Sequence, residues 1–204
     1  QATKGGGHGD YRLIVLAPHS VQEMYSLTML AFDLADRYRN PVFLLGDAII
    51  GQMKEPFVPS PYEASVSQEK PWALTGCKGR ERQNLKSLYL KDNAIEVHNW
   101  KLHGKYERIR QAEARAESFL LDGARIALVA FGTAARVCKT AIQWARKEGI
   151  PAGMLRPITL FPFPEREVLE QELELPRLRE RLARMRTQRL VYRHLSQPTP
   201  FAFP

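Results

Sequence analysis

The sequence predicts an α/β protein built from two units, each with a strand, a helix and a second strand. Leu13 to Ala17 is a short apolar run typical of a strand buried on both faces, and residues 42–45 form the return strand after a helical stretch. The second unit has the same order, with strands at residues 126–131 and 152–155. Because each connection is too long for a hairpin, we expect both strand pairs to be parallel.

The first helix begins at a pair of polar residues with capping spacing. Ser20 and Glu23 match the capping box, in which two side chains accept hydrogen bonds from free amides at a helix start. Apolar residues at helical spacing follow as far as Asn40-Pro41, which ends the helix.

The second unit has a similar start and stop. Thr133 is the predicted N-cap, and Gly149 with Pro151 ends the helix. An amphipathic helix over residues 105–121 is predicted to lead into this unit. Between the units, residues 54–103 carry four prolines and no clear period, which favours a boundary there.

The net charge of +8 is concentrated at the end of the chain. From Pro176 onward, seven arginines, no lysine and the single acid Glu180 give +6, which leaves +2 on the preceding 175 residues. This tail is predicted to be a solvated helix, with polyanion or membrane-surface binding as the minority alternative.

Several classes of protein are excluded by the composition. No apolar run approaches the roughly 18 residues of a membrane helix. Cys77 and Cys138 are isolated, which argues against zinc or iron–sulfur sites in this chain and favours the reducing cytoplasm. The histidines show no metal-ligand spacing, and Ser20 lacks the setting of a hydrolase nucleophile.

The densest glycine run, residues 5–9, precedes a strand instead of following one. That is the wrong context for a phosphate-binding loop of the Rossmann or P-loop kind. Two interpretations remain: a rim loop in which His8 is a polar contact or proton donor, and a flexible entry loop. The residues alone favour the entry loop by about two to one.

Two further positions follow strands, where ligands usually bind in open α/β sheets. Asp47 lies beyond residues 42–45, and a ligand contact and a helix cap are equally good explanations of it. Gly132-Thr133 with Arg136 could bind an anion through helix-start amides, but simple helix capping explains the pair as well.

Three stretches resemble the α-type subunit of 2-oxoacid:ferredoxin oxidoreductases, and together they cover residues 1 to about 110. The stretches are QATKGGGHGDY from Gln1 with APHSVQEM from Ala17; PVFLLGD from Pro41 with GQMKEP from Gly51; and KPWALTG from Lys70, SLYL from Ser87, His98-Asn99 and KYER from Lys105. The third stretch looks most like the branched-chain (2-oxoisovalerate) and 2-oxoglutarate members.

The resemblance implies a fold for each part of the chain. Residues 1–54 would be the end of a pyrimidine-binding domain for thiamine diphosphate, and 55–104 an extended linker or inter-subunit arm. Residues 105–175 would form a three-layer α/β domain like the transketolase C-terminal domain, followed by a divergent basic tail, 176–204. Because the chain opens on Gln1 without an initiator Met, we interpret it as a C-terminal fragment of such a subunit.

The resemblance also implies a reaction and partners. A 2-oxoacid, coenzyme A and oxidised ferredoxin would give acyl-CoA, CO₂ and reduced ferredoxin, with thiamine diphosphate as the electron sink. The thiamine-binding β-type subunit would hold the diphosphate and magnesium, and γ- and δ-type partners the iron–sulfur clusters. No membrane or nucleic acid is expected as a partner.

The site residues carried over from this resemblance are few. His8 would be catalytic, with Gly7, Gly9, Asp10 and Asp47 as cofactor contacts and no metal ligand. The glutamate that activates the aminopyrimidine in this family has no counterpart, so the chain is expected to be inactive alone.

The tail departs from the family pattern. A last strand could lie at residues 190–192, but the Asn and Gly-Gln turn that follows it in the family is missing. Because lysine gives way abruptly to arginine, we interpret residues 176–204 as a divergent or frame-altered end.

Two other functions remain open from the sequence. One is a different transketolase-like thiamine enzyme, which would not reduce ferredoxin or viologen. The other is a degenerate, non-catalytic fragment that serves as an assembly or binding module, including a polyanion binder that acts through the basic tail.

Overall fold

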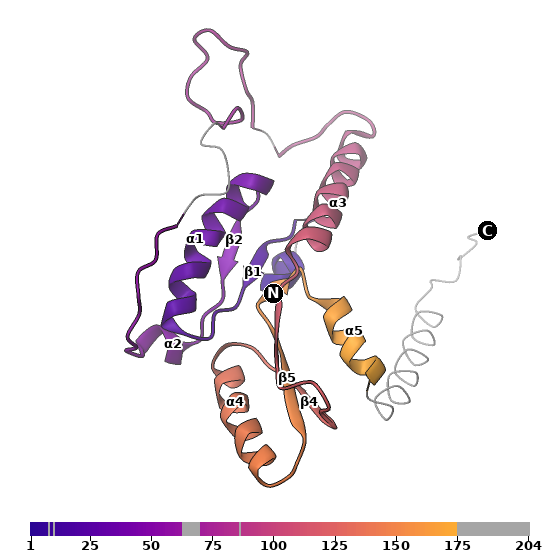
Figure 1. Ribbon diagram of the computed structural model, residues 1–204. Helices are drawn as coiled ribbons and strands as arrows, with labels where there is room; N and C mark the ends of the chain where they lie inside the picture. The colour runs from indigo at the N-terminus through magenta and orange to yellow at the C-terminus, as the bar shows by residue number, and fades with distance from the viewer. Residues whose placement is uncertain (8, 10, 63–69, 86, 175–204) are drawn as a thin grey trace, which may run out of the picture.

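A computed structural model describes residues 1–7, 9, 11–62, 70–85 and 87–174 (Figure 1). The tail 176–204, with its predicted last strand, lies outside these residues. The elements in chain order are η1 (Ala2–Gly7), β1 (Ile14–Leu16), α1 (Val21–Tyr38), β2 (Val42–Leu44), α2 (Ala48–Gln52), α3 (Ala94–Glu113), β3 (Ala116–Phe119), β4 (Ile126–Val129), α4 (Gly132–Lys147), β5 (Ala152–Pro157), β6 (Thr159–Phe161) and α5 (Glu165–Glu174).

The first sheet has the strand order β2-β1-β6. β1 pairs in parallel with β2, as predicted, and Val15 lies opposite Phe43. All three β1 residues are buried, which fits a strand covered on both faces. β6 pairs antiparallel with β1 and forms the other edge of the sheet. The sequence did not predict this strand, which lies more than 140 residues after β1 in the chain.

The predicted capping box at the start of α1 is half confirmed. Ser20 is the N-cap, and its hydroxyl accepts a hydrogen bond from the Glu23 amide at 3.1 Å. The Glu23 carboxylate accepts from the His19 amide at 2.9 Å instead of the Ser20 amide. The helix then buries Leu27, Ala31 and Leu34 against β1.

The second sheet has the order β3-β5-β4, with α4 against one face. β4 and β5 are parallel, as predicted, with Leu128 opposite Met154. Ala135 and Ile142 of α4 pack on Met154, which is completely buried.

The predicted helix over residues 105–121 is wrong at both ends. α3 begins at Ala94 and ends at Glu113, and Ala116–Phe119 is the strand β3. The reason is tertiary: these four residues pair antiparallel with β5, and cross-strand pairing outweighs local helical preference. Tyr106 and Ile109 of α3 are buried in the core formed by β1 and α1.

Residues 53–62, which we call the strap, have no regular structure and run from the end of α2 along the outer side of α1. Val58 exchanges two backbone hydrogen bonds with the Gln22 side chain, at 2.8 and 3.2 Å. Further along, the Tyr62 hydroxyl donates to the buried carboxylate of Asp33 at 2.7 Å. The strap is thus tied to successive turns of one helix.

β6 and α3 both contribute to the first core, so segments distant in the sequence share it. The division of the chain at residues 54, 104 and 175 stays a prediction. Among the helices that the structure describes, none is both long enough and apolar enough to cross a bilayer.

Candidate functional site

The predicted site residues do not converge in the described structure. Gly7 ends η1, and Gly9 follows it with a φ of 69°, both before β1. Asp47 lies just after β2, which runs parallel to β1. The glycines and Asp47 are therefore at opposite ends of the parallel strands β1 and β2. His8 and Asp10 lie outside the described residues.

The glycine-rich segment folds back on the start of β1. Gly5 has a φ of 62°, and a Cβ at this position would lie 2.1 Å from the Tyr11 carbonyl oxygen. Only glycine fits both the left-handed backbone and this close approach. The glycine run therefore has a local steric reason that is independent of any ligand.

Two adjoining recesses open beside this segment. One of about 700 Å³ is lined by Thr3, Arg12, Arg110 and Phe161, among others. The other, of about 490 Å³, shares Arg12 and Arg110 and extends to Trp100 on α3. The recesses bring arginine and aromatic side chains together, with Thr3 of η1 lining the larger one.

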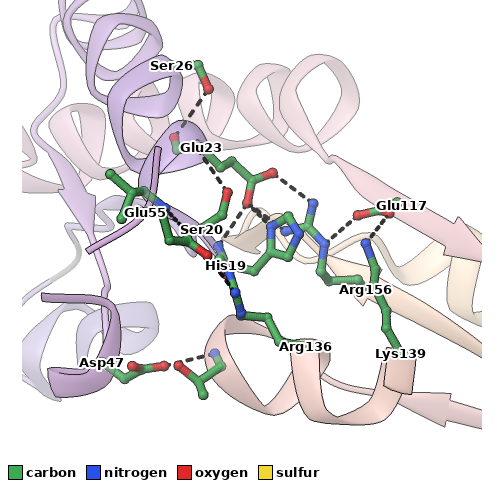
Figure 2. Close-up of polar contacts among 12 residues, drawn as sticks. His19, Ser20, Glu23, Ser26, Asp47, Glu55, Glu117, Arg136, Lys139 and Arg156 are labelled. Atoms are coloured by element: carbon green, nitrogen blue, oxygen red, sulfur yellow. Dashed lines mark hydrogen bonds and ion pairs between the residues drawn. The ribbon is translucent and has the colours of Figure 1, made fainter. Parts of the chain in front are cut away.

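A dense polar cluster occupies the opposite, carboxyl ends of the parallel strands (Figure 2). Arg156, at the end of β5, donates two hydrogen bonds to the Glu23 carboxylate at 2.8 and 2.9 Å. His19 Nδ1 lies 2.6 Å from the same carboxylate. Burial opposes ionisation of Glu23, but hydrogen bonds from His19 and Arg156 outweigh it and lower its pKa to about 2.

Arg156 also pairs within its own sheet. Its Nε donates to Glu117 of β3 at 2.7 Å, and the two residues lie directly opposite each other in the antiparallel ladder. Lys139 of α4 donates to the other oxygen of Glu117 at 2.6 Å. Burial raises the pKa of Glu117, but Lys139 and Arg156 together hold it below its ordinary value.

A second bridge runs through the start of the strap. Glu55 accepts a hydrogen bond from the Val21 amide, at the first turn of α1, at 2.9 Å. It also pairs with Arg136 of α4, whose Nη1 donates to the His19 carbonyl oxygen at 3.1 Å. The Val21 amide and Arg136 lower the pKa of Glu55.

Asp47 forms the third bridge and corrects the prediction for Thr133. The N-cap of α4 is Phe131, so Thr133 is the second helical residue. Asp47 Oδ2 accepts from the Thr133 amide at 2.9 Å, and Oδ1 accepts from the Ile50 amide at 3.0 Å. One carboxylate thus accepts hydrogen bonds at the starts of two helices, including the α4 amides for which anion binding was one of two interpretations of the sequence. Hydrogen bonding from Thr133 and then Ile50 lowers the pKa of Asp47.

Within the described residues this cluster is a junction, not a reaction centre. Each of its carboxylates already faces a cation or helix amides, as Figure 2 shows. The described part of the chain has no grouping of three or more His, Cys, Asp or Glu that could hold a metal ion. Sequence reasoning missed the junction because Glu23 and Arg156 lie 133 residues apart, and no local pattern signals such a pair.

Comparison with known families decides the identity of the chain. The model "Pyruvate flavodoxin/ferredoxin oxidoreductase, thiamine diP-bdg" matches residues 2–118, more than half of the chain. The model "Pyruvate:ferredoxin oxidoreductase core domain II" follows at residues 124–176. The chain belongs to the 2-oxoacid:ferredoxin oxidoreductase family. This confirms the family and the α/β fold class that the sequence predicted.

Relatives place this 2-oxoacid:ferredoxin oxidoreductase chain among α-type subunits. It is 49% identical over 171 residues to ketoisovalerate oxidoreductase subunit VorB of Methanothermobacter thermautotrophicus, covering 83% of this chain and 48% of the relative. It is 31% identical over 189 residues to 2-oxoglutarate synthase subunit KorA of Methanocaldococcus jannaschii, covering 78% of this chain and 50% of the relative. The chain thus spans about half the length of these curated relatives.

A solved structure agrees with the fold. The 2-oxoglutarate:ferredoxin oxidoreductase from Magnetococcus marinus, with 2-oxoglutarate, coenzyme A and succinyl-CoA bound, superposes with a TM-score of 0.59. The match covers 82% of this oxidoreductase chain and 34% of that chain, at 20% identity. At this identity the similarity supports the architecture and not a ligand site.

Proposed function

We propose that this chain is part of the α-type subunit of an enzyme that oxidatively decarboxylates a branched-chain 2-oxoacid. With coenzyme A and oxidised ferredoxin, the complete enzyme forms acyl-CoA, CO₂ and reduced ferredoxin. The observation that carries the proposal is the 49% identity to a ketoisovalerate oxidoreductase subunit, against 31% and 35% for two 2-oxoglutarate synthase subunits. The preferred substrate is therefore 2-oxoisovalerate, with 2-oxoglutarate second.

The described residues do not by themselves form a thiamine diphosphate site. Gly7 and Gly9 lie before the start of β1, and Asp47, beyond the end of the parallel strand β2, accepts hydrogen bonds from two helix amides. We therefore derive no chemical step on the cofactor from this chain. In the proposal, the β-type subunit holds the diphosphate and magnesium, and partner chains hold the iron–sulfur clusters.

The proposed role of this chain is to close the site from one side. Thr3, just before the glycine-rich segment, lines one of the two recesses that contain Arg12 and Arg110, so a ligand held by the partner would meet guanidinium groups there. His8 as catalytic group, and Gly7, Gly9, Asp10 and Asp47 as cofactor contacts, belong to this proposal. So does the cytoplasmic location, which is consistent with Cys77 and Cys138 being free thiols.

The test has two steps. Isothermal calorimetry should detect thiamine diphosphate only when the β-type subunit accompanies the α-type subunit. The assembled complex should then reduce viologen with coenzyme A and 2-oxoisovalerate faster than with 2-oxoglutarate. Viologen reduction with neither acid would contradict the reaction class, and binding by this chain alone would contradict the shared site.

A further inference from the structure

Four cations lie together where the end of α1 meets α3. Asn40, which is buried and follows the α1 C-cap Arg39, accepts a hydrogen bond on its Oδ1 from Lys105 Nζ of α3 at 2.9 Å. Lys101 and Arg108 lie four residues before and three residues after Lys105, so the three share one face of the helix. We call Arg39, Lys101, Lys105 and Arg108 the cation cluster.

Within the described structure, no carboxylate balances the cation cluster. None of its members forms an ion pair with a described acid. The acids nearest to it in sequence are already engaged, because Asp36 pairs with Lys70 at 2.7 Å and Glu107 pairs with Arg110. The positive charge of the cluster is therefore not neutralised by the described part of the chain.

Lys105 is the half-buried member of the cluster, and the other three are exposed. Its ammonium donates to the Asn40 amide oxygen and lies 5.3 Å from the centre of the Tyr106 ring, and neither group removes its charge. Burial lowers the pKa of Lys105, and repulsion from the other three members lowers it further. A bound anion would relieve both the desolvation and the repulsion.

A solvated helix surface does not account for this arrangement. Like charges at i, i+4 destabilise a helix, and long basic side chains usually extend into water. Here Asn40 holds Lys105 next to Arg39, and its own amide nitrogen donates to the carbonyl oxygens of Arg12 and Pro41 at 3.1 and 3.0 Å. The acceptor of the Lys105 bond is thus fixed by the backbone, so the cluster is held in place before a ligand binds.

We propose that the cation cluster binds the phosphate groups of a small, multiply charged ligand. Arginine presents paired N–H donors that match phosphate oxygens, and lysine adds a compact charge. The cluster has two residues of each type. Trp72 lies beside it, with its ring centre 5.2 Å from the Arg39 guanidinium carbon, so a nucleoside phosphate has an aromatic side chain within reach. The site goes beyond the proposed reaction, because it lies wholly on this chain and needs no partner subunit.

Two other polyanions fit the cluster less well. A protein that makes roughly six to ten phosphate contacts on DNA spreads its cations along the duplex, whereas this cluster occupies one helix face and one neighbouring residue. An acidic protein surface is also less suitable, because protein interfaces are depleted in lysine and the most buried cation here is Lys105. A compact di- or triphosphate matches the size and the charge of the cluster.

The test is calorimetric titration of the full chain with pyrophosphate and with ADP at constant ionic strength. The double variant Lys101→Gln with Arg108→Gln should weaken binding of both by about tenfold or more, because each loses charge-assisted hydrogen bonds. The matched control is Arg125→Gln with Lys147→Gln. These two cations are also exposed and have no carboxylate partner among the described residues, so the same loss of charge should alter Kd less than twofold.

Two further variants separate binding from structure and identify the source of the phosphate. Lys105→Gln should abolish most of the pyrophosphate binding and leave the thermal unfolding midpoint unchanged or higher, because it removes a repelled charge. Trp72→Leu should leave pyrophosphate binding unchanged. If it weakens ADP binding, the site takes a nucleoside phosphate, and if pyrophosphate and ADP bind equally in both proteins, the site recognises the phosphate groups alone.

Four results would overturn the proposal. They are no binding of either ligand, an equal loss of affinity in the control pair, a Lys105→Gln variant that is destabilised but binds normally, and tighter cluster-dependent binding to a DNA duplex or a polyglutamate peptide than to pyrophosphate.

The same variants keep this site distinguishable from the proposed function. Thiamine diphosphate binding by the chain alone that is lost in the Lys101→Gln and Arg108→Gln variant would belong to the cluster, whereas binding that persists would contradict the shared site. An assembled complex that fails to reduce viologen would contradict the proposed reaction and leave the phosphate site standing.

Discussion

Arg156 and Glu23 form a forked ion pair, with both guanidinium Nη atoms within 2.9 Å of the carboxylate, although 133 residues separate them. Arg156 is almost fully buried, at 2% exposure, and its remaining Nε bonds to Glu117. One side chain therefore joins α1 of the first unit to β3 and β5 of the second.

Replacing this arginine should weaken the fold strongly. Arg156→Met removes the cation but keeps much of the apolar volume, and it leaves the partly buried carboxylates of Glu23 and Glu117 without their shared guanidinium. We expect the free energy of unfolding to fall by about 3–5 kcal/mol, as for other broken buried ion pairs. Urea unfolding checks this. Arg166→Met, at an exposed ion pair, should cost less than about 1 kcal/mol.

Acid should weaken the same junction. Glu23 has its pKa lowered from 4.5 to about 2, so the folded state holds the ionised form more tightly than the unfolded state does. Its contribution is fully present above pH 4.5 and is lost as the pH falls toward 2. The difference between the two pKa values corresponds to about 3 kcal/mol of unfolding free energy.

Urea unfolding at several pH values measures the acid effect. Glu23→Gln should be less stable at pH 7 and should lose less stability between pH 5 and pH 3, the range in which the unfolded state of the wild type takes up the proton while folded Glu23 stays largely ionised. Equal slopes for the variant and the wild type would show that another group carries the acid sensitivity.

Asp47 should behave as a double helix cap. Asp47→Ala removes the acceptor for the Ile50 and Thr133 amides together, so both amides should exchange with deuterium faster. Asp47→Asn keeps a carbonyl oxygen and should preserve part of the protection. If Asp47→Asn retains the protection and still impairs thiamine diphosphate binding in the assembled complex, the predicted cofactor role gains support.

Glycine substitutions should have opposite effects at two positions. Gly5→Ala places a Cβ against the Tyr11 carbonyl oxygen at a positive φ, so we expect a loss of about 1–3 kcal/mol. Gly104→Ala lies inside α3 with nothing within 4 Å, so it should add about 0.5–1 kcal/mol. Thermal unfolding midpoints of the two variants compare them directly, and a rise for both would refute the steric account of Gly5.

Local patterns in the sequence were enough for several features. The apolar runs at β1 and β4 predicted strands, and Ser20 predicted the start of α1, because strand formation and helix capping depend on near neighbours. The expected burial is confirmed for β1 only: β4 is an edge strand, and Ile126 and Val129 are about half exposed. The resemblance carried by residues 1–110 predicted the family, since long ordered matches need no structure.

The tertiary structure decided what depends on distant residues. Residues 116–119 became the strand β3 because β5 offers them a hydrogen-bonding edge, and the amide of Thr133 is bonded by Asp47 because folding brings the two helix starts together. Glu23 and Arg156 likewise have no sequence signal that links them. A side chain's type shows which bonds it can form, but only the folded chain determines which partner is within reach.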